Sequence, residues 1–256
     1  MIGLYAAQVR AAIRASVSDR GNFTLQVGGM LLNDLVFLVM WSMFFAGFRS
    51  VGSWTRPDMA LLMGLMMILV GVTGVFAGGY RDMAATILNG ELDGLLTQPK
   101  GLIGRLLARE SLAGAWGDLV GGTVLLIWFA GLVPKDLPLT LIALVIGGVV
   151  YLSAAIAFAS LAFWATGARS FSRELMDFTL LFSTYPGSIY HGAVKVIAFT
   201  LLPAGFIVLT PAKLIRNPGV ETLSVVILAS GGYAAVALGL FHLGLQRYRR
   251  GERLAG

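Results

Sequence analysis

The sequence contains no cysteine and only two histidines, His191 and His242, which lie far apart in the chain. The absence of cysteine excludes disulfides, cysteine-ligated zinc, iron–sulfur clusters and thiol catalysis. Two separated histidines and the absence of an H-E-x-x-H motif do not indicate a metal site. Both histidines are interpreted as interface residues. We therefore expect no metal ligands and no catalytic residues on this chain.

Charged residues are scarce: they make up 12% of the chain, against 57% hydrophobic residues. This imbalance is typical of a polytopic membrane protein and not of a soluble domain. A net charge of +6 would favour nucleic-acid binding in a soluble protein. In a membrane protein the location of positive charge matters more than its total, so we expect membrane lipids and no nucleic acid as partners.

Six apolar stretches are long enough to cross a bilayer, which takes about 20 mostly apolar residues in a helix. The sequence therefore predicts an all-α integral membrane protein. The expected spans are residues 26–48, 59–79, 112–133, 138–165, 174–190 and 222–245. No internal repeat or low-complexity linker divides them, so we expect a single domain over residues 1–256.

Lysine and arginine residues are distributed unevenly between the two sides that six spans create. The richer side carries Arg10, Arg14, Arg20, Arg81, Lys100, Arg105, Arg109, Arg169, Arg173, Arg247, Arg249, Arg250 and Arg253. The other side carries Arg49, Arg56, Lys135, Lys195, Lys213 and Arg216. Because positive charge is enriched on the cytoplasmic side, this pattern predicts that both termini are cytoplasmic.

The first 20 residues are predicted to form an amphipathic helix. Its apolar positions recur every three to four residues and are flanked by arginines; they are Ile2, Tyr5, Val9 and Ile13. A helix of this kind lies in the plane of the membrane interface. A disordered tail is the alternative.

The apolar stretch 191–211 is nearly long enough to be a seventh span. A seventh crossing would place the arginine-rich tail outside, so parity predicts a re-entrant hairpin that enters and leaves on the outer side. Pro203 would break a helix near the middle, Gly205 follows, and Pro211 would end the stretch. Such backbone is tolerated at membrane depth only where protein or water surrounds it. A kinked continuous helix is the alternative.

A polar segment, residues 83–110, separates the second and third expected spans. Its first half predicts a helix that Pro99 ends and that carries an acidic rim of Glu91 and Asp93. The leucines of this helix share one face; they are Leu88, Leu92, Leu95 and Leu96. A short helix with an apolar face and an acidic rim suits a groove on another protein.

A second amphipathic stretch follows, in which Arg105, Arg109 and Glu110 oppose four apolar residues, Leu102, Ile103, Leu106 and Leu107. The alternative to a docking surface is an interfacial helix that rests on lipid. Acidic residues argue against that alternative, because the cytoplasmic leaflet is anionic and attracts Lys and Arg.

Two motifs, in this order, resemble those of ABC-2 type transporter permeases. The first is Gly90-Glu91-Leu92-Asp93-Gly94-Leu95-Leu96-Thr97-Gln98-Pro99, which is similar to the family signature G-x-[LI]-[DE]-x-L-L-x-x-P. The second comprises Tyr185-Pro186 through Tyr190, Phe199–Phe206 and Thr210-Pro211-Ala212, and it resembles the bacterial subfamily of ABC-2 permease components. The similarity covers most of the chain in length and span layout.

The resemblance implies the ABC-2, or type V exporter, fold: six transmembrane helices, an N-terminal interfacial helix, a cytoplasmic coupling helix and a re-entrant hairpin before the last span. By resemblance, coupling to the ATPase falls on Gly90, Glu91, Leu92, Asp93, Leu95, Leu96 and Pro99. The hairpin gate falls on Tyr185, Pro186, Tyr190, Pro203, Gly205 and Pro211.

The resemblance also implies partners and a location. These are a cytoplasmic ABC ATPase that binds ATP and Mg, a second permease that is identical or a paired homologue, and the bacterial inner membrane. The chain has no G-x-x-x-x-G-K-[ST] motif, so it lacks the usual phosphate-binding loop and we expect no cofactor on it. The implied function is ATP-driven export of an amphipathic or hydrophobic substrate, such as a lipid, glycolipid or drug-like molecule, from the cytoplasm or inner leaflet.

Two carboxylates, Asp34 and Asp118, fall inside expected spans, where charge is costly and usually faces the bundle or a water-filled path. They either contact substrate or protons, or they pair with an arginine or hydroxyl between helices, or they stay wet near the headgroups. The aromatic and methionine-rich run 40–45 is either a substrate contact or lipid-facing packing.

Two other classes of function compete with export. A membrane-embedded lipid-modifying enzyme needs a cluster of polar catalytic groups at one depth, and the sequence does not supply one. An ATP-independent secondary transporter would be supported by inverted repeats or by more charges near the midplane. The sequence favours the permease.

Overall fold

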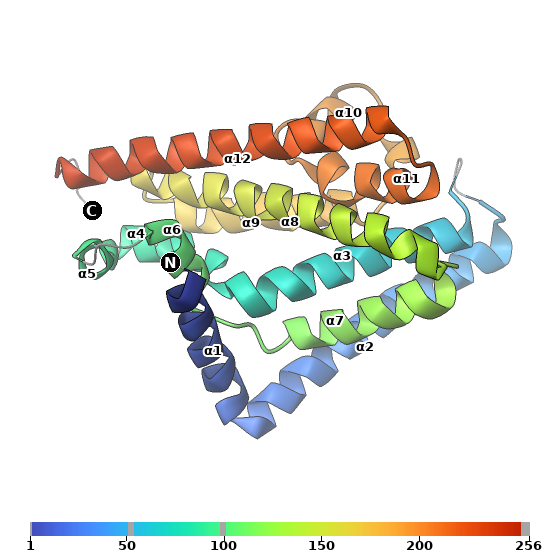
Figure 1. The fold of residues 1–256 in the computed structure, drawn as a ribbon, viewed down its shortest axis with the longest axis horizontal. Helices are drawn as coiled ribbons and strands as arrows, with labels where there is room; N and C mark the ends of the chain where they lie inside the picture. The colour runs from blue at the N-terminus through green and yellow to red at the C-terminus, as the bar shows by residue number, and fades with distance from the viewer. Residues whose placement is uncertain (1, 51–53, 98–100, 252–256) are drawn as a thin grey trace.

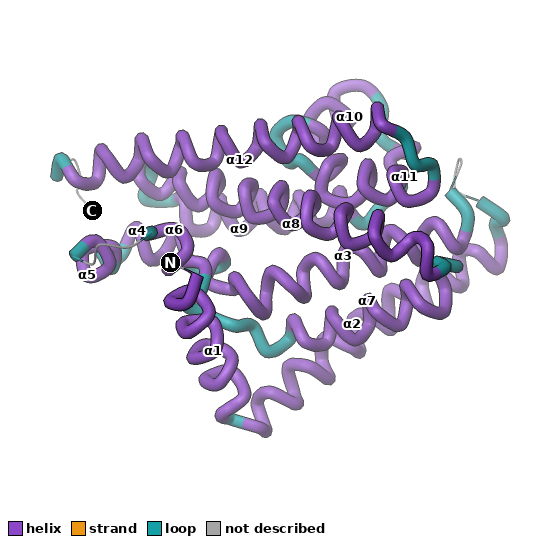
Figure 2. The backbone as a smooth tube through the Cα atoms, in the orientation of Figure 1, coloured by secondary structure: helices purple, strands orange, loops and turns teal. Residues whose placement is uncertain are grey.

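The computed structural model describes residues 2–50, 54–97 and 101–251, and within these ranges it is helical and has no strand. Figures 1 and 2 show one bundle whose long helices run between two ends, joined by short loops. These helices are α2 (Arg20–Gly47), α3 (Arg56–Ala77), α7 (Ala115–Val124), α8 (Leu137–Ser160), α9 (Ala168–Ser183) and α12 (Val220–Arg249). The π-helix η2 (Leu125–Phe129) extends α7, and the 3₁₀ helix η4 (Leu161–Phe163) follows α8.

Short helices gather at the two ends of the bundle (Figure 1). One end, called the α4–α6 end, has η1 (Gly78–Tyr80), α4 (Met83–Leu88), α5 (Leu92–Leu96) and α6 (Leu102–Leu107). The other, called the α10–α11 end, has η3 (Pro134–Asp136), η5 (Gly187–Ile189), α10 (Gly192–Phe199), the π-helix η6 (Gly205–Leu209) and α11 (Thr210–Arg216).

Helix α3 packs in the interior, where glycines allow close contact with α7. A Cβ added at Gly71 would lie 2.9 Å from the carbonyl oxygen of Ala115. A Cβ added at Gly122 would lie 2.9 Å from the carbonyl oxygen of Gly64. Small residues bring membrane helices together in this way, because lipid tails provide no hydrophobic force between helices.

Among the described residues, four helices are long and apolar enough to cross a membrane: Arg20–Gly47, Arg56–Leu88, Pro134–Phe163 and Val220–Arg249. They overlap the first, second, fourth and sixth expected spans. The third expected span corresponds to a shorter apolar helix, Ala115–Phe129. The fifth corresponds to α9, which ends at Ser183 instead of residue 190. Its 16 residues extend about 24 Å, less than the roughly 30 Å hydrocarbon layer.

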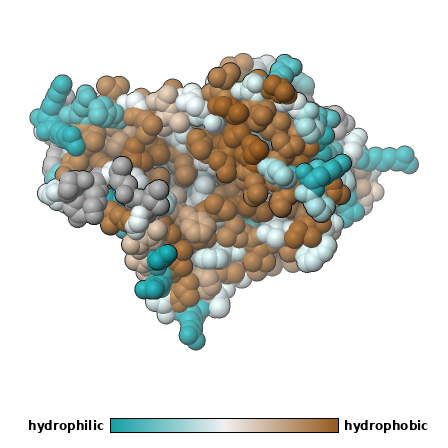
Figure 3. All heavy atoms as spheres, viewed as in Figure 1, coloured by the Kyte–Doolittle hydropathy of each residue, from teal (hydrophilic) through white to brown (hydrophobic). Residues whose placement is uncertain are grey.

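The outer surface has a broad hydrophobic band between hydrophilic ends (Figure 3). Leu25 of α2 and Leu228 of α12 each keep 75% of their surface exposed. Exposed apolar surface on this scale is unusual for a soluble monomer. The band is therefore suited to lipid or to other membrane subunits.

Both ends of the described part of the chain approach the α4–α6 end. The hydroxyl of Tyr5, on α1 (Ile2–Ser18), donates to the carbonyl oxygen of Phe76 at 2.7 Å. The hydroxyl of Tyr248, in the last turn of α12, donates to the Asp93 carboxylate at 2.9 Å. An even number of membrane crossings would likewise place both termini on the same side. Helix α1 lies steeply across the direction of α3 and α8 (Figure 1), and its Val9 is buried.

Candidate functional site

The leucine-striped segment is two short helices and not one. Helix α4 ends at Leu88 and α5 begins at Leu92, so the expected continuous helix over residues 88–98 is wrong. Gly90 lies between them at φ 75°, in the left-handed region that favours glycine. The Gly90 amide donates to the Ile87 carbonyl at 3.3 Å and the Glu91 amide donates to the Thr86 carbonyl at 3.2 Å. This pair of bonds is a Schellman cap, which ends α4.

The leucine face of this segment packs on the chain itself. Leu92 is fully buried, and Leu88, Leu95 and Leu96 are partly buried against the same core. The expectation that this apolar face is offered to another protein is therefore wrong for Leu92, and a role of the partly exposed Leu95 and Leu96 in coupling stays a prediction. Its exposed part is polar, and we call it the α5 edge: Asn89, Glu91, Asp93, Gly94 and Thr97. Pro99 lies outside the described residues.

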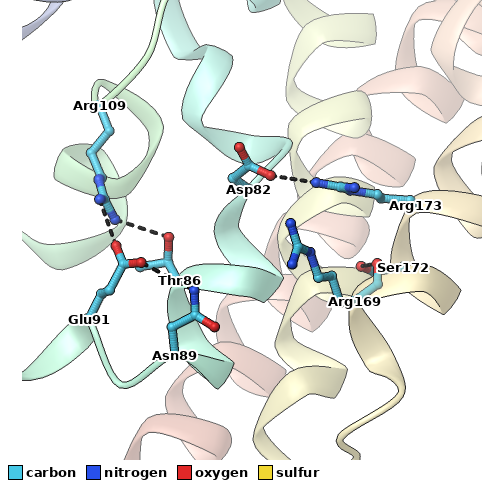
Figure 4. Close-up of polar contacts among 8 residues, drawn as sticks. All are labelled: Asp82, Thr86, Asn89, Glu91, Arg109, Arg169, Ser172 and Arg173. Atoms are coloured by element: carbon cyan, nitrogen blue, oxygen red, sulfur yellow. Dashed lines mark hydrogen bonds and ion pairs between the residues drawn. The ribbon is translucent and has the colours of Figure 1, made fainter.

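An ion pair holds the start of α5 (Figure 4). The Arg109 guanidinium lies 2.8 Å from the Glu91 carboxylate and also donates to the Thr86 hydroxyl at 3.0 Å. The Asn89 amide donates to Glu91 at 3.3 Å. The hydrogen bonds from Arg109, and then Asn89, lower the pKa of Glu91. Because both partners are exposed, the pair contributes little stability, and its main effect is to position α5.

Helix α5 also contacts α12 near its start and α6 near its end. The buried side chain of Arg105, which the sequence assigned to a polar face, instead donates to the Leu95 carbonyl oxygen at 2.8 Å. A cation there satisfies a carbonyl at the C-terminal end of a helix. The Tyr248 hydroxyl binds Asp93 from α12. Helix α5 is thus joined by side-chain contacts to α4, α6 and α12.

Sequence reasoning missed a second ion pair at the α4–α6 end. The Arg173 guanidinium of α9 lies 2.5 Å from the Asp82 carboxylate, which precedes α4 (Figure 4). The two residues are 91 positions apart, so no local pattern could have paired them. This ion pair extends the α4–α6 end to α9.

The predicted hairpin has a turn between α10 and η6, at residues 200–204, and Pro203 lies in it. The ring of Phe199 packs directly against Gly205: a Cβ added at Gly205 would lie 2.1 Å from it. The absence of a side chain at Gly205 therefore lets the two arms of the hairpin meet. The Tyr233 hydroxyl lies 2.9 Å from the carbonyl oxygens of Phe199 and Thr200. Tyr233 is 13 residues into α12, or about 20 Å from its start. The turn therefore lies well along the length of α12 from the α10–α11 end, and most of α10 is exposed on the outside of the bundle.

Pro211 does not end this stretch as expected. It lies in the first turn of α11, which continues to Arg216. A proline is tolerated there because the first turn of a helix does not need its N–H. The second arm of the hairpin is therefore longer than the sequence predicted.

The remaining predicted gate residues precede the hairpin, in the connection between α9 and α10. The ring of Tyr185 lies 6.1 Å from that of Trp41 on α2. Pro186 is buried, and the hydroxyl of buried Tyr190 donates to the Phe182 carbonyl oxygen at 2.7 Å. These residues anchor the connection to α2 and α9.

Sequence reasoning counted Arg216 only as a positive charge and did not predict its contacts. Its guanidinium lies 2.9 Å from the Asp58 carboxylate at the start of α3. It also donates to the carbonyl oxygens of Pro57 at 3.0 Å and Ala130 at 2.7 Å. It thereby joins the end of the hairpin to α3 and to the end of η2.

Asp34 of α2 and Asp118 of α7 are both buried. A Cβ added at Gly121 would lie 2.6 Å from an Asp34 carboxylate oxygen. Gly121 is one helical turn after Asp118 on α7, so the Asp34 side chain lies close to this part of α7. Among the described residues neither carboxylate has an arginine or lysine in ion-pair range, and Asp34 Oδ2 lacks a hydrogen-bond partner. The two acids thus lie in the α2–α7 contact and not on the lipid face. The described residues include no group of His, Cys, Asp and Glu that could hold a metal ion.

Comparison with known proteins gives one result that bears on this arrangement. A family model described as "ABC-2 family transporter protein" matches residues 31–251. No curated protein and no solved structure matches the chain. The match begins within α2 and includes the α4–α6 end, the hairpin and α12.

Proposed function

Because the chain belongs to the ABC-2 family of transporter proteins, we propose that it is the permease subunit of an ATP-driven exporter. Permeases of this family are membrane transport subunits, not themselves catalytic, and normally work with an ABC ATPase. ATP and Mg bind to that ATPase in this proposal. A second permease, identical or a paired homologue, completes the complex in the bacterial inner membrane.

The observation that carries the proposal is the attachment of α5. Its exposed edge is acidic, and its other contacts lead to α4, α6 and α12. We propose that the ATPase docks on the α5 edge through Glu91 and Asp93. Closure of the ATPases on ATP then displaces α5, and α12 carries the displacement across the membrane.

The proposed topology has six transmembrane helices, with α1 in the cytoplasmic interface and α4–α6 as the coupling segment. Two of the six, α7 with η2 and α9, are short and pack beside longer helices. The α10–α11 end faces outward, and the hairpin is the outer gate. Arg216 holds this gate to α3 through Asp58.

The apolar surface of the long helices indicates which class of substrate the permease moves. An exposed apolar band on α2 and α12 gives access to molecules dissolved in lipid, which supports a hydrophobic or amphipathic substrate leaving the inner leaflet. Asp34 and Asp118 are proposed to contact its polar part or a proton. A lipid-modifying enzyme and a secondary transporter gain no specific support from the described residues.

The first experiment identifies the partners. A tagged chain purified from its native membrane should co-purify with an ABC ATPase and, for a heteromeric complex, with a second permease. A complex without any ATPase would contradict the proposal and favour secondary transport.

The second experiment tests docking. The double variant Glu91→Lys, Asp93→Lys should insert normally but lose the ATPase and transport. The matched control Glu91→Arg, Arg109→Glu restores the ion pair with its charges exchanged. It should also bind the ATPase weakly, because the α5 edge still carries the wrong charge. Full recovery in the control would show that Glu91 only positions α5, and normal transport in the double variant would refute docking there.

A further inference from the structure

An apolar groove lies between α6 and α12, on surfaces to which the proposed coupling assigns no contact. Its volume is about 530 Å³, within the range of about 300–1,000 Å³ typical of ligand sites. The described lining consists of Gly101, Leu102, Ile103, Gly104, Leu238, Gly239, Phe241, His242 and Leu245. Apart from the His242 imidazole, these side chains carry no polar group.

Glycines leave this groove open. A Cβ added at Gly239 or at Gly101 would meet no atom within 4 Å. The space beside α12 is therefore not filled by another part of the described chain. The α12 wall of the groove belongs to a candidate membrane span, and the opposite wall is α6.

The groove leads toward positive charge. Leu238, His242 and Leu245 fall on one face of α12, and Arg249 follows at the next helical position on that face. The rise from Leu238 to Arg249 is about 16 Å. Arg249 and Arg250 are exposed at the α4–α6 end. The groove thus combines an apolar slot with a cationic mouth.

We propose that this groove binds an anionic phospholipid, with one acyl chain in the slot and the phosphate at Arg249. Basic groups at the cytoplasmic ends of membrane helices attract anionic lipids. The His242 imidazole supplies a hydrogen-bond donor for an ester carbonyl between chain and phosphate. A protein segment would find few polar partners here, whereas an apolar groove that leads to cationic side chains suits an anionic lipid. This inference rests on the membrane location of α12 and not on coupling to an ATPase.

The test uses phosphatidylglycerol with a photoreactive diazirine in its acyl chain, and phosphatidylethanolamine with the same chain. The purified full-length protein is irradiated in nanodiscs and the labelled peptides are mapped. Labelling should concentrate on residues 101–104 and 238–245. Gly239→Leu should strongly reduce it because the leucine side chain projects into the slot, whereas Gly232→Leu, two turns away on the same face and also in open space, should not.

A second variant tests the phosphate contact without altering the slot. Arg249→Gln should reduce the preference for phosphatidylglycerol over phosphatidylethanolamine by about fivefold, the effect of one basic residue near an anionic surface. Equal labelling in Gly239→Leu and Gly232→Leu, or an unchanged lipid preference in Arg249→Gln, would overturn the proposal. A change of oligomeric state in Gly239→Leu, with lipid labelling intact, would assign the groove to a second copy instead.

Discussion

Gly90 is the residue on which the position of α5 depends. Its positive φ lets α4 end in a cap and turns the chain so that Leu92 enters the core. Glu91 and Arg109 then hold the new helix from the solvent side. Residue-level changes here should therefore affect α5 before they affect the rest of the bundle.

Gly90→Ala should destabilise the segment by about 1–2 kcal/mol, because a side chain is unfavourable in the left-handed region. Gly90→Asn should cost less, since asparagine visits that region more readily. Thermal unfolding of both variants, together with ATPase co-purification, measures the effect. Equal stability of Gly90→Ala and the wild type would contradict the assigned cap.

The Glu91–Arg109 ion pair should make the segment sensitive to acid. Arg109 lowers the pKa of Glu91, so the stabilisation is complete above the ordinary carboxyl pKa and is lost as pH falls through the lowered value. The difference in Tm between wild type and Glu91→Gln should be small, largest at about pH 7, and should shrink as the pH falls below the ordinary carboxyl pKa of about 4.3. A difference that persists in acid would mean that glutamine disturbs the segment by another route.

At the scale of elements, the hairpin is held by close backbone contact. A Cβ added at Gly147 of α8 would lie 2.3 Å from the carbonyl oxygen of Ile207 in η6. Tyr233 holds the turn, and Arg216 holds the far end of the second arm. Few side chains are therefore responsible for the depth at which the turn lies.

Gly147→Ala should displace η6 and destabilise the protein by about 1–3 kcal/mol, as overpacking does. Its neighbour is the control: a Cβ at Gly148 meets no atom within 4 Å. Gly148→Ala should be neutral or stabilising by up to about 1 kcal/mol, because alanine favours helices more than glycine does. Melting temperatures in detergent distinguish the two, and similar effects would rule out the close contact.

Pro203→Ala should favour a longer continuous helix across the turn, because it removes the residue that interrupts one. The complex should still assemble and bind ATP, but transport should be lost or uncoupled from hydrolysis. Transport and ATPase activity in reconstituted vesicles measure this. Wild-type values for both would show that the gate lies elsewhere.

At the scale of the whole molecule, the two ends of the bundle differ in charge and contents. The α4–α6 end has both ends of the described chain and the polar coupling segment, and the α10–α11 end has the hairpin. Four helices are long enough to span the membrane, and α7 and α9 lie alongside them. This arrangement is compatible with four or six crossings, both of which leave the termini on one side.

Cysteine labelling should show on which side of the membrane the termini lie. The chain has no native cysteine, so only the introduced residue can react. In right-side-out vesicles an impermeant thiol reagent should modify Asn217→Cys but not Gly251→Cys. The physical reason is the positive-inside distribution of arginine and lysine. Labelling of Gly251→Cys from outside would invert the proposed topology or require a seventh crossing.

The sequence by itself determined the properties that depend on local spacing or composition. Hydropathy predicted an all-helical membrane protein, and the four long spans overlap the predicted ones. The Asn89-Gly90 pair contained a signal for a helix end that the leucine spacing obscured. Periodicity grouped the four leucines, but they belong to two helices and pack on this chain, because the cap at Gly90 separates α4 from α5.

Only the tertiary structure decided what those faces meet. Leu92 packs on this chain and not on a partner, and Arg105 is buried beneath α5, because α6 returns under it. The partners in Asp82–Arg173 and Asp58–Arg216 are far apart in sequence, and Gly147 meets Ile207 through backbone atoms. Such contacts depend on how helices cross, and periodicity within one helix carries no information about crossing.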